Sequence, residues 1–447
     1  MHISHELNDQ LTINGALHYT KGFGYFEEFK TGEKFKDYGL ENVVSASNDV
    51  IDRTDLVRRR WLDNDFYGMT FSINYDVSNK LNFNFGGAAN NYEGDHFGEI
   101  IWAEFASNSF PRENYYESKS QKFDANAYLK TNMILNEQMS AMVDLQIRHV
   151  DYTGKGTDND LRDIRIDEAY TFFNPKVGFN YKSNENLTSY IFAGIGNREP
   201  NRSDFIDQAP NTPNKDANQP EKMYNVEIGS SYKTNQYSLS ANLYYMHYID
   251  QLVATGQLND VGSPLRQNVD LSFRRGVELQ AGVQILKRLS TKLNATFSQN
   301  KIKEYNELLY AYDENFDIDS IYSFNLKNTN IAFSPNIIIS NELSYQPTDN
   351  VELALLTRYV GKQYLDNTQF DGRSLDDYLV NDIRIQITLE QKLFKEMKFQ
   401  FLVNNVLANE YSANGYTYSY VYGRKITENF VYPQALRNYM IGLNLKF

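Results

Sequence analysis

Leu239-Ser240-Ala241-Asn242-Leu243-Tyr244-Tyr245-Met246-His247-Tyr248-Ile249 is a stretch in which residue character alternates at every position. Its odd positions hold Leu, Ala, Leu, Tyr, His and Ile, and Ser and Asn are among the residues between them. Because residues i and i+2 share one face of a strand, the pattern predicts a β-strand with one apolar and one more polar face. The same period recurs at Met139–Ile147, and helical periodicity is hard to find elsewhere. The sequence therefore predicts an all-β protein.

The connections between these segments alternate in length along the chain. We count roughly sixteen segments by their period of two. Short connections rich in Asn, Lys, Ser and Asp, as tight hairpins require, are predicted at 77–80, 135–138, 182–186, 233–237, 286–290, 346–350 and 391–396. Long connections are predicted at about 23–65, 90–118, 150–170, 197–221, 250–270, 301–330, 364–378 and 411–431. A Greek-key sandwich has no reason to keep this order, whereas an up-and-down barrel has turns at one rim and longer loops at the other.

The polar strand faces favour a barrel in a membrane. Asp, Gln, Arg, Lys, Glu and Asn recur on one face of the predicted strands. A soluble barrel buries apolar residues inside, whereas a transmembrane barrel turns them to lipid and keeps a wet, polar lumen. The 34 Tyr, 28 Phe and 2 Trp residues suit the two membrane interfaces, and the hydrophobic fraction of 41% fits strands that face lipid with every second residue. We therefore expect a transmembrane antiparallel up-and-down β-barrel.

Composition and missing motifs argue against several other classes. The formal net charge of −13 is opposite in sign to that of a nucleic-acid groove, and no apolar run reaches the length of a transmembrane helix. The chain has no cysteine, and its six histidines lack metal-ligand spacing. No nucleophile elbow, Walker loop or dinucleotide fingerprint is present. We expect no enzyme, no cofactor and no metal site. Loose calcium binding at Asp313–Asp319 or Asp158–Asp160, and contact of His96 or His149 with metal or haem, stay alternatives.

The two ends of the chain suggest an orientation. The segment 437–447 has apolar residues at 439, 441, 443, 445 and 447, like the carboxy-terminal signal of outer-membrane barrels. A periplasmic Phe447 would make the short turns periplasmic and the long loops extracellular. The first strand is predicted at Leu11–Tyr19, after a turn at 6–10 that has no strand before it. We therefore expect this chain to be the carboxy-terminal part of a longer protein.

Three motifs make the chain similar to TonB-dependent outer-membrane receptors. The first is Asn197–Phe205 followed by Pro220-Glu221, Glu227 and Gly229, with Asn218 where the family usually has Leu. The second is Asn405-Val406-Leu407-Ala408-Asn409-Glu410-Tyr411, which resembles the family's Asn-Leu-Phe-Asn/Asp-x-x-Tyr except at Ala408. The third is Pro433–Phe447, with Arg437 and the aromatic terminus. With the loop pattern, the resemblance covers essentially the whole chain.

The resemblance carries expectations about architecture and function. The family's barrel has 22 strands and follows a plug domain with a TonB-contacting segment, so residues 1–447 would hold about the last sixteen strands, without the plug. It implies location in the outer membrane of a Gram-negative bacterium, surrounded by lipid. It also implies TonB-dependent uptake of a scarce nutrient bound at the extracellular loops. A ferric siderophore is the default ligand, and cobalamin, haem and oligosaccharide are alternatives.

Aromatic and basic loop residues are the candidate ligand-binding groups. Tyr416, Tyr418, Tyr420 and Tyr422 alternate, which places four rings on one face of an extended segment. These rings either pack on neighbouring loops or form an aromatic platform for the ligand. Trp102 and Phe105 offer a second aromatic patch. Arg198 and Arg202 could meet an anionic ligand or could organise the rim.

Two functions from other classes stay open at this point. A passive porin-like channel would need no plug and would conduct in liposomes. An adhesin or phage-docking surface would keep binding cells without a plug. No catalytic residue is expected in any of the three cases.

Overall fold

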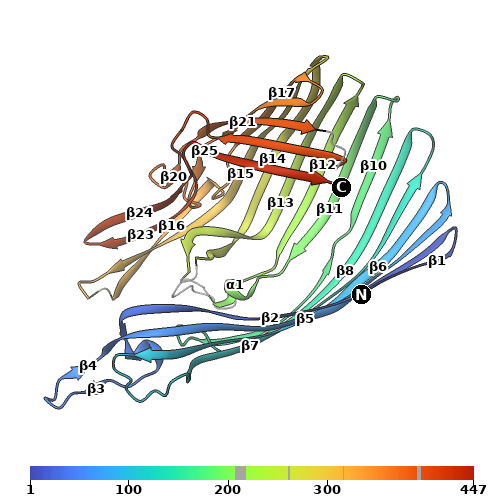
Figure 1. Cartoon of the computed structure of the whole chain (residues 1–447). Helices are drawn as coiled ribbons and strands as arrows, with labels where there is room; N and C mark the ends of the chain where they lie inside the picture. Colours follow the sequence, from blue (N-terminus) through green and yellow to red (C-terminus); the bar gives the residue numbers. More distant parts are fainter. Residues whose placement is uncertain (207–217, 260–261, 316, 390–393) are drawn as a thin grey trace. The chain divides into compact units, whose positions relative to one another are not determined.

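The computed structural model describes residues 1–206, 218–259, 262–315, 317–389 and 394–447, and these ranges contain almost only β-strands. The two helices are η1 (Phe35–Tyr38) and α1 (Arg202–Ile206). No helix in these ranges is long and apolar enough to cross a membrane. The chain divides into two compact units (Figure 1). Unit 1 contains residues 1–134 and 142–175, and unit 2 contains residues 135–141 and 176–447.

Unit 1 is built from long antiparallel strands that follow one another in sequence. Its main strands are β1 (His2–Asn8), β2 (Leu11–Lys34), β5 (Arg53–Ser78), β6 (Leu81–Ala103), β7 (Asn114–Ile134), β8 (Met139–Thr157, whose first residues belong to unit 2) and β9 (Asp163–Phe173). Along the chain, β1 pairs with β2, β2 with β5, β5 with β6, and β6 with β7, and β8 pairs with β9. The connection from β2 to β5 carries η1 and the small ribbon of β3 (Val43–Val44) and β4 (Val50–Ile51).

Unit 2 continues the same up-and-down order. Its strands are β10 (Lys176–Lys182), β11 (Leu187–Arg198), β12 (Glu221–Lys233), β13 (Tyr237–Leu258), β14 (Pro264–Leu286), β15 (Leu289–Tyr312), β16 (Ile318–Asn330), β17 (Ile337–Thr348), β18 (Val351–Val360), β19 (Gln363–Tyr364), β20 (Ser374–Leu375), β21 (Tyr378–Leu389), β22 (Glu396–Asn404), β23 (Ser412–Tyr422), β24 (Arg424–Pro433) and β25 (Asn438–Lys446). Each of β10 to β14 pairs antiparallel with its successor, and the sheet continues from β15 through β17, β18, β21 and β22 to β25.

The all-β, antiparallel up-and-down prediction is confirmed. Of the described strands, 21 belong to one large sheet and four belong to two small ribbons. Four passages of the chain are interrupted and contribute two sheet strands each (β9 and β10, β16 and β17, β22 and β23, β24 and β25), which leaves 17 passages. The count of roughly sixteen missed β1. The turn after Asn8 was predicted correctly, but the expectation that no strand precedes it was wrong, because β1 pairs with β2 from His2 onward.

Six of the seven short turns lie where they were predicted, and the seventh, at 391–396, falls mostly outside the described residues. Of the predicted long connections, 197–221 and 364–378 contain little strand among their described residues, whereas the other six are largely strand. The segment 23–65 was predicted as a loop, yet β2 runs to Lys34 and β5 starts at Arg53, so that the two strands have 24 and 26 residues. A transmembrane strand needs about 9–11 residues, so both ribbons extend well beyond a bilayer. Outside lipid both faces of a strand meet water, so strict alternation of apolar and polar residues is no longer required. The alternation therefore ends in the sequence before the strand itself ends.

Cross-strand rows show which face meets lipid. In unit 2 the residues paired in register across six strands are all apolar: Ile191, Ile228, Leu243, Val277, Phe297 and Ile337. Leu243 at the centre of this row is 54% exposed. A neighbouring row on the other face contains Asn242, Glu278 and Thr296. This division gives each strand one lipid side and one water side, as a membrane barrel requires.

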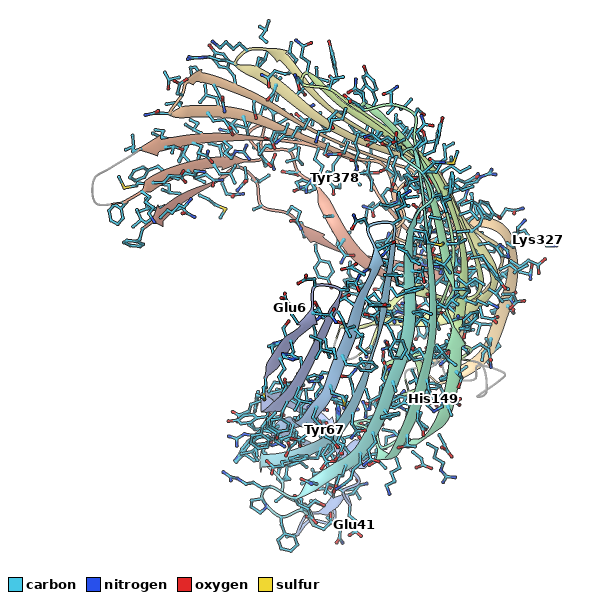
Figure 2. All side chains as sticks on the ribbon, turned by 90° about the vertical axis from the view of Figure 1, so that its right-hand side faces the viewer. Glu6, Glu41, Tyr67, His149, Lys327 and Tyr378 are labelled. Carbon is cyan, nitrogen blue, oxygen red and sulfur yellow. The ribbon has the colours of Figure 1, made fainter. Side chains whose placement is uncertain are left out.

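In unit 1 a pair of tyrosines indicates where the lipid face ends. Tyr19 and Tyr67 are opposite each other on β2 and β5 (Tyr67 is labelled in Figure 2). The hydroxyl of Tyr19 donates to Asp65 at 2.7 Å, and that of Tyr67 donates to Glu93 at 2.9 Å. Rings against lipid with hydroxyls turned to charged groups are typical of an interfacial belt. We therefore take this level of β2 and β5 as the membrane surface opposite the short turns.

The second motif forms a tight turn between β22 and β23. Asn405 is buried, and its side chain donates to the carbonyl of Asn409 at 2.8 Å and accepts from the amide of Asn409 at 3.0 Å. Ala408 has a φ of +55°, in the left-handed region. The resemblance implies Asn or Asp at this position, and these residues adopt that conformation more readily than Ala.

We expect Ala408→Asn to stabilise the protein by about 0.5–1 kcal/mol, because Asn relieves the strain of a left-handed Ala. The measurement is the denaturant midpoint of purified protein in detergent. Ala435→Asn, at an exposed site of the same region without positive φ, is the control and should leave the midpoint unchanged. A midpoint that does not rise for Ala408→Asn would contradict the strain assignment.

Candidate functional site

The hairpin of β23 and β24 carries the predicted tyrosines at the end of unit 2 opposite the short turns (Figure 1). Tyr416 lies opposite Phe430, and their rings stack at 4.8 Å with an interplanar angle of 12°. Tyr418 meets the edge of Tyr416 at 5.7 Å, and Tyr432 lies 6.0 Å from Tyr416. The hairpin therefore carries a compact aromatic cluster.

The outer half of the same strand is fixed to neighbouring strands. The hydroxyl of Tyr418 donates to the carbonyl of Leu258 at 3.0 Å. Tyr420 meets the edge of Tyr312 at 6.1 Å, and its hydroxyl donates to Glu428 at 3.3 Å. Tyr422 is 38% exposed at the hairpin tip. Most of these rings thus pack on their neighbours, and their role in ligand binding stays a prediction.

The opposite face of β23 lies against the connection 361–377. Gly415 and Thr417 are buried there, and a Cβ on Gly415 would lie 3.2 Å from the side chain of Leu365. Asn367 is fully buried; its amide donates to the carbonyl of Ala254 at 2.7 Å, and its oxygen accepts from the amide of Ala332 at 2.8 Å. These contacts hold the connection between β13, β23 and the end of β16.

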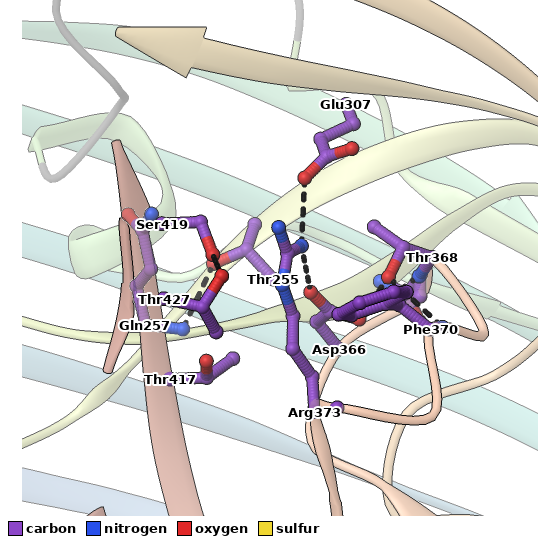
Figure 3. Close-up of polar contacts among 12 residues, drawn as sticks. Thr255, Gln257, Glu307, Asp366, Thr368, Phe370, Arg373, Thr417, Ser419 and Thr427 are labelled. Atoms are coloured by element: carbon purple, nitrogen blue, oxygen red, sulfur yellow. Dashed lines mark hydrogen bonds and ion pairs between the residues drawn. The ribbon is translucent and has the colours of Figure 1, made fainter. Parts of the chain in front are cut away.

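A buried arginine lies at the centre of this packing. Nη1 of Arg373 donates to Glu307 and to Asp366, each at 2.6 Å (Figure 3). The Arg373 side chain is 3% exposed, and the ring of Phe370 lies 5.8 Å from its guanidinium. Burial lowers the pKa of Arg373, but the negative charges of Asp366 and Glu307 raise it by more. The pKa of Arg373 therefore lies above its ordinary value, and the group stays charged. Lys425 lies 3.8 Å from Glu307 and supplies a second positive charge.

A small polar cavity adjoins Arg373. Its volume is about 60 Å³, and hydroxyl and amide side chains line much of it: Thr255, Gln257, Gln267, Thr368, Thr417 and Ser419. Nε and Nη2 of Arg373 are buried and have no hydrogen-bond partner among the described residues. Buried polar groups normally find a partner, so these donors suit water or an oxygen-rich part of a ligand. Burial also raises the pKa of Tyr305, which lines the same cavity.

A larger pocket lies on the polar face of β12 to β15. It has a volume of about 410 Å³ and is lined by residues that include Glu227, Asn242, Tyr244, Arg274 and Glu278. The segment between β16 and β17 forms part of its border, and Arg274 donates to Ser334 there at 3.0 Å. This pocket contains acids, a base and amides, which suits a wetted inner wall.

The motif residues have structural explanations. Arg198 donates to Glu221 at 3.0 Å, and Glu221 also accepts from the amide of Leu252 at 3.2 Å, so both residues organise the strand ends. A Cβ on Gly229 would lie 2.4 Å from the ring of Tyr190, so glycine lets this ring lie across β12. Arg202 begins α1. The structure therefore ties Arg198 to the rim, and a ligand role for either arginine stays a prediction.

The second aromatic patch lies in unit 1. Trp102 is near the end of β6, half exposed, with its ring 6.5 Å from Phe29. Phe105 follows β6, and its amide donates to Thr54 at 3.0 Å. Because these two residues and the hairpin tyrosines belong to different units, each group is a separate candidate.

The acidic loop segments form turns. Asp158 is buried and accepts from the amide of Arg162 at 2.8 Å and from its guanidinium at 2.6 Å. Asp313 accepts from the amides of Asn315 and Asp317 at 2.8 and 3.0 Å. The described ranges contain no group of three His, Asp or Glu residues that could hold a metal ion.

Sequence reasoning missed Arg373, Glu307, Asp366 and Asn367. These residues lie in predicted loops, where charged and amide side chains are common. The stretch Asp366-Asn367-Thr368 indicates a turn, but no local pattern marks which of its side chains are buried. Only the contact with β15, 66 residues away from Arg373, distinguishes them.

Comparison with protein families gives one match of nearly full length. The family model described as "TonB dependent receptor-like, beta-barrel" matches residues 2–406. No curated protein matches the chain.

Solved structures match over the whole chain at low identity. The ferric-catecholate import receptor Fiu from E. coli K12, in its closed form, is 14% identical with a TM-score of 0.65, and the match covers 100% of this chain and 63% of that chain. The copper transporter OprC is 15% identical with a TM-score of 0.69, covering 97% and 62%. The siderophore receptor PiuA from Acinetobacter baumannii is 13% identical with a TM-score of 0.67, covering 100% and 63%. The chain thus spans less than two thirds of these proteins, and the likeness shows their barrel fold.

Proposed function

We propose, from the premise that this chain belongs to the TonB-dependent receptor family, that the complete protein imports a scarce nutrient with energy supplied through TonB. The family consists of transporters, not enzymes, in the outer membrane of Gram-negative bacteria. Lipid surrounds such a barrel, and a plug domain and TonB are the partners that we propose for the complete receptor.

The nutrient that we propose is a ferric siderophore. The observation that carries this choice is the Tyr416–Phe430 ring cluster on one face of β23, with the Arg373 cavity on the other. Stacked rings suit the flat groups of an aromatic chelator, and a guanidinium with unbonded N–H groups on Nε and Nη2 suits its oxygens. Fiu and PiuA are named for ferric-catecholate import and siderophore reception, which supports the same choice. OprC is named a copper transporter, so copper is the alternative to test.

The test uses the complete receptor, purified in detergent, with a ferric catecholate chelate, ferric citrate, Cu²⁺ and cobalamin as probes. We expect one of the ferric chelates to bind with a Kd below about 1 μM, which corresponds to about −8 kcal/mol. Tyr416→Ala should weaken this binding at least tenfold, because it removes the ring at the centre of the cluster. Tyr232→Ala, beside the short turn after β12, is the control and should bind as the wild type does.

Uptake of radioactive iron in cells separates the proposal from its rivals. We expect uptake from the bound chelate to stop in cells that lack TonB. Uptake that continues without TonB would support the passive channel instead. Binding of Cu²⁺ or cobalamin, with none of either ferric chelate, would overturn the proposed nutrient and leave the family assignment intact.

A further inference from the structure

A second aromatic layer lies on the outer face of unit 1, beyond the belt formed by Tyr19 and Tyr67. We call it the outer aromatic patch and define it as Phe23, Tyr25, Trp61 and Phe97. The ring of Trp61 lies 4.3 Å from that of Tyr25 and 5.0 Å from that of Phe23, and it stacks on Phe97 at 5.8 Å. Phe23 and Tyr25 lie an even number of residues from Tyr19 on β2, so they share its face. Trp61 pairs with Tyr25 and Phe97 pairs with Trp61, so all four rings face the same side as the belt tyrosines.

The two faces of these strands are covered differently. On the inner face η1 packs over β5, so that Phe35, Tyr38 and Leu56 are buried. On the outer face Phe23 is 64% and Tyr25 is 47% exposed. The described part of the chain therefore covers the inner face and leaves the outer rings open.

A charged row separates the patch from the belt, and its charges are paired. Lys21 contacts Asp63 and bonds to Asp65 at 2.9 Å. Above it, Arg59 bonds to Glu27 at 2.8 Å and lies 4.3 Å from the Tyr25 ring centre. The indole N–H of Trp61 donates to Glu99 at 2.9 Å, which fixes the ring orientation. The patch thus presents ring faces with little unpaired charge around them.

The height of the patch points to its surroundings. Trp61 is six residues from Tyr67 along β5, which is about 20 Å along a strand. With the usual strand tilt this is about 14 Å above the belt, outside the hydrocarbon yet on the lipid side of the wall. The outer leaflet of this membrane carries glycolipid, whose sugars occupy that height. Aromatic faces are electron-rich and attract the C–H faces of sugar rings.

We propose that the outer aromatic patch binds the sugar headgroup of the glycolipid that surrounds the protein. The surface is continuous with the lipid-facing side of the barrel, which places the headgroup of a neighbouring glycolipid molecule against it. The paired charges select the uncharged sugar rings rather than the phosphate groups. Such contacts anchor the extended ribbon of β2 and β5 in the headgroup layer.

The test places the full-length protein in phospholipid nanodiscs and titrates two probes. One probe is lipopolysaccharide with its core sugars, and the other is lipid A, which lacks them. We expect the wild type to bind the first at least tenfold more tightly than the second. The double variant Tyr25→Ala/Trp61→Ala should lose this preference. Phe66→Ala on the inner face of β5 is the matched control and should keep it.

A second variant and two defined contrary results make the test decisive. Phe23→Ser removes the most exposed ring of the patch, so it reports on binding even if the double variant fails to fold, and it should lower the preference at least threefold. Equal binding of both probes by the wild type would overturn the proposal. The proposal would also be overturned if another protein copurified with the wild type in a fixed stoichiometry and was lost in Phe23→Ser.

Discussion

Replacing Arg373 with methionine is expected to lower the free energy of unfolding by about 3–5 kcal/mol. The substitution keeps a long side chain but leaves Asp366 and Glu307 without the cation that both contact at 2.6 Å. Arg373 and Asp366 are almost completely buried, so bulk water does not solvate the carboxylate that loses its partner. The measurement is chemical denaturation of purified protein, with limited proteolysis of the connection 361–377 as a local readout.

An exposed ion pair in the same connection is the control for this prediction. Lys362 lies 2.6 Å from Asp371, and both side chains are largely exposed. Lys362→Met should therefore cost no more than about 1 kcal/mol. Adding Asp366→Asn to Arg373→Met should recover part of the stability, because one buried charge is removed. Equal losses for Arg373→Met and Lys362→Met would show that burial does not strengthen the Arg373 contacts.

Gly256→Ala is expected to destabilise unit 2 by about 2–5 kcal/mol, through backbone strain and overpacking together. Gly256 on β13 has a φ of +94°, and a Cβ there would lie 2.7 Å from the carbonyl oxygen of Leu365. That oxygen is backbone, so it moves only if the connection 361–377 moves with it. We expect faster proteolysis of this connection as well as a lower denaturation midpoint.

Gly423, at the tip of the β23–β24 hairpin, separates strain from crowding. Its φ is +64°, but a Cβ there would have nothing within 4 Å. Gly423→Ala should therefore cost only the strain of about 1–2 kcal/mol and leave proteolysis of the connection 361–377 unchanged. If the two variants behaved alike, the close approach between β13 and Leu365 would not matter for stability.

The sequence predicted the elements that lipid constrains. The alternation at Leu239–Ile249 marks part of β13, and the six short turns that the structure describes lie at the predicted places, because a membrane strand must alternate and a tight hairpin needs turn residues. The ribbons beyond the membrane escaped prediction. In β2 the stretch 23–34 places aromatic and charged residues on both faces, as a solvated ribbon allows, so it was predicted as a loop.

The candidate site was predictable only where it is local. The alternating tyrosines of β23 do share a face, as the period of two requires. Their partners Phe430 and Leu258 could not be read from the segment itself, because hairpin register and inter-strand packing decide them. The burial of Arg373 depends on its contact with β15. The burial of Asn367 depends on its contacts with β13 and with the segment after β16. These segments are distant in sequence, so no local pattern could predict that either residue is buried.

The uninterrupted run of β5 from the short turn at Asn79-Lys80 to Arg53 has one more consequence. Neighbouring residues of a strand point to opposite sides. One residue inserted between Tyr67 and the short turn would therefore turn every side chain from Arg53 to Tyr67 to the other face of the sheet. Trp61 would then face the lumen, and both Arg58 and Arg60 would face outward. Viable length variants of this strand should therefore differ by pairs of residues, or carry a bulge that restores the phase.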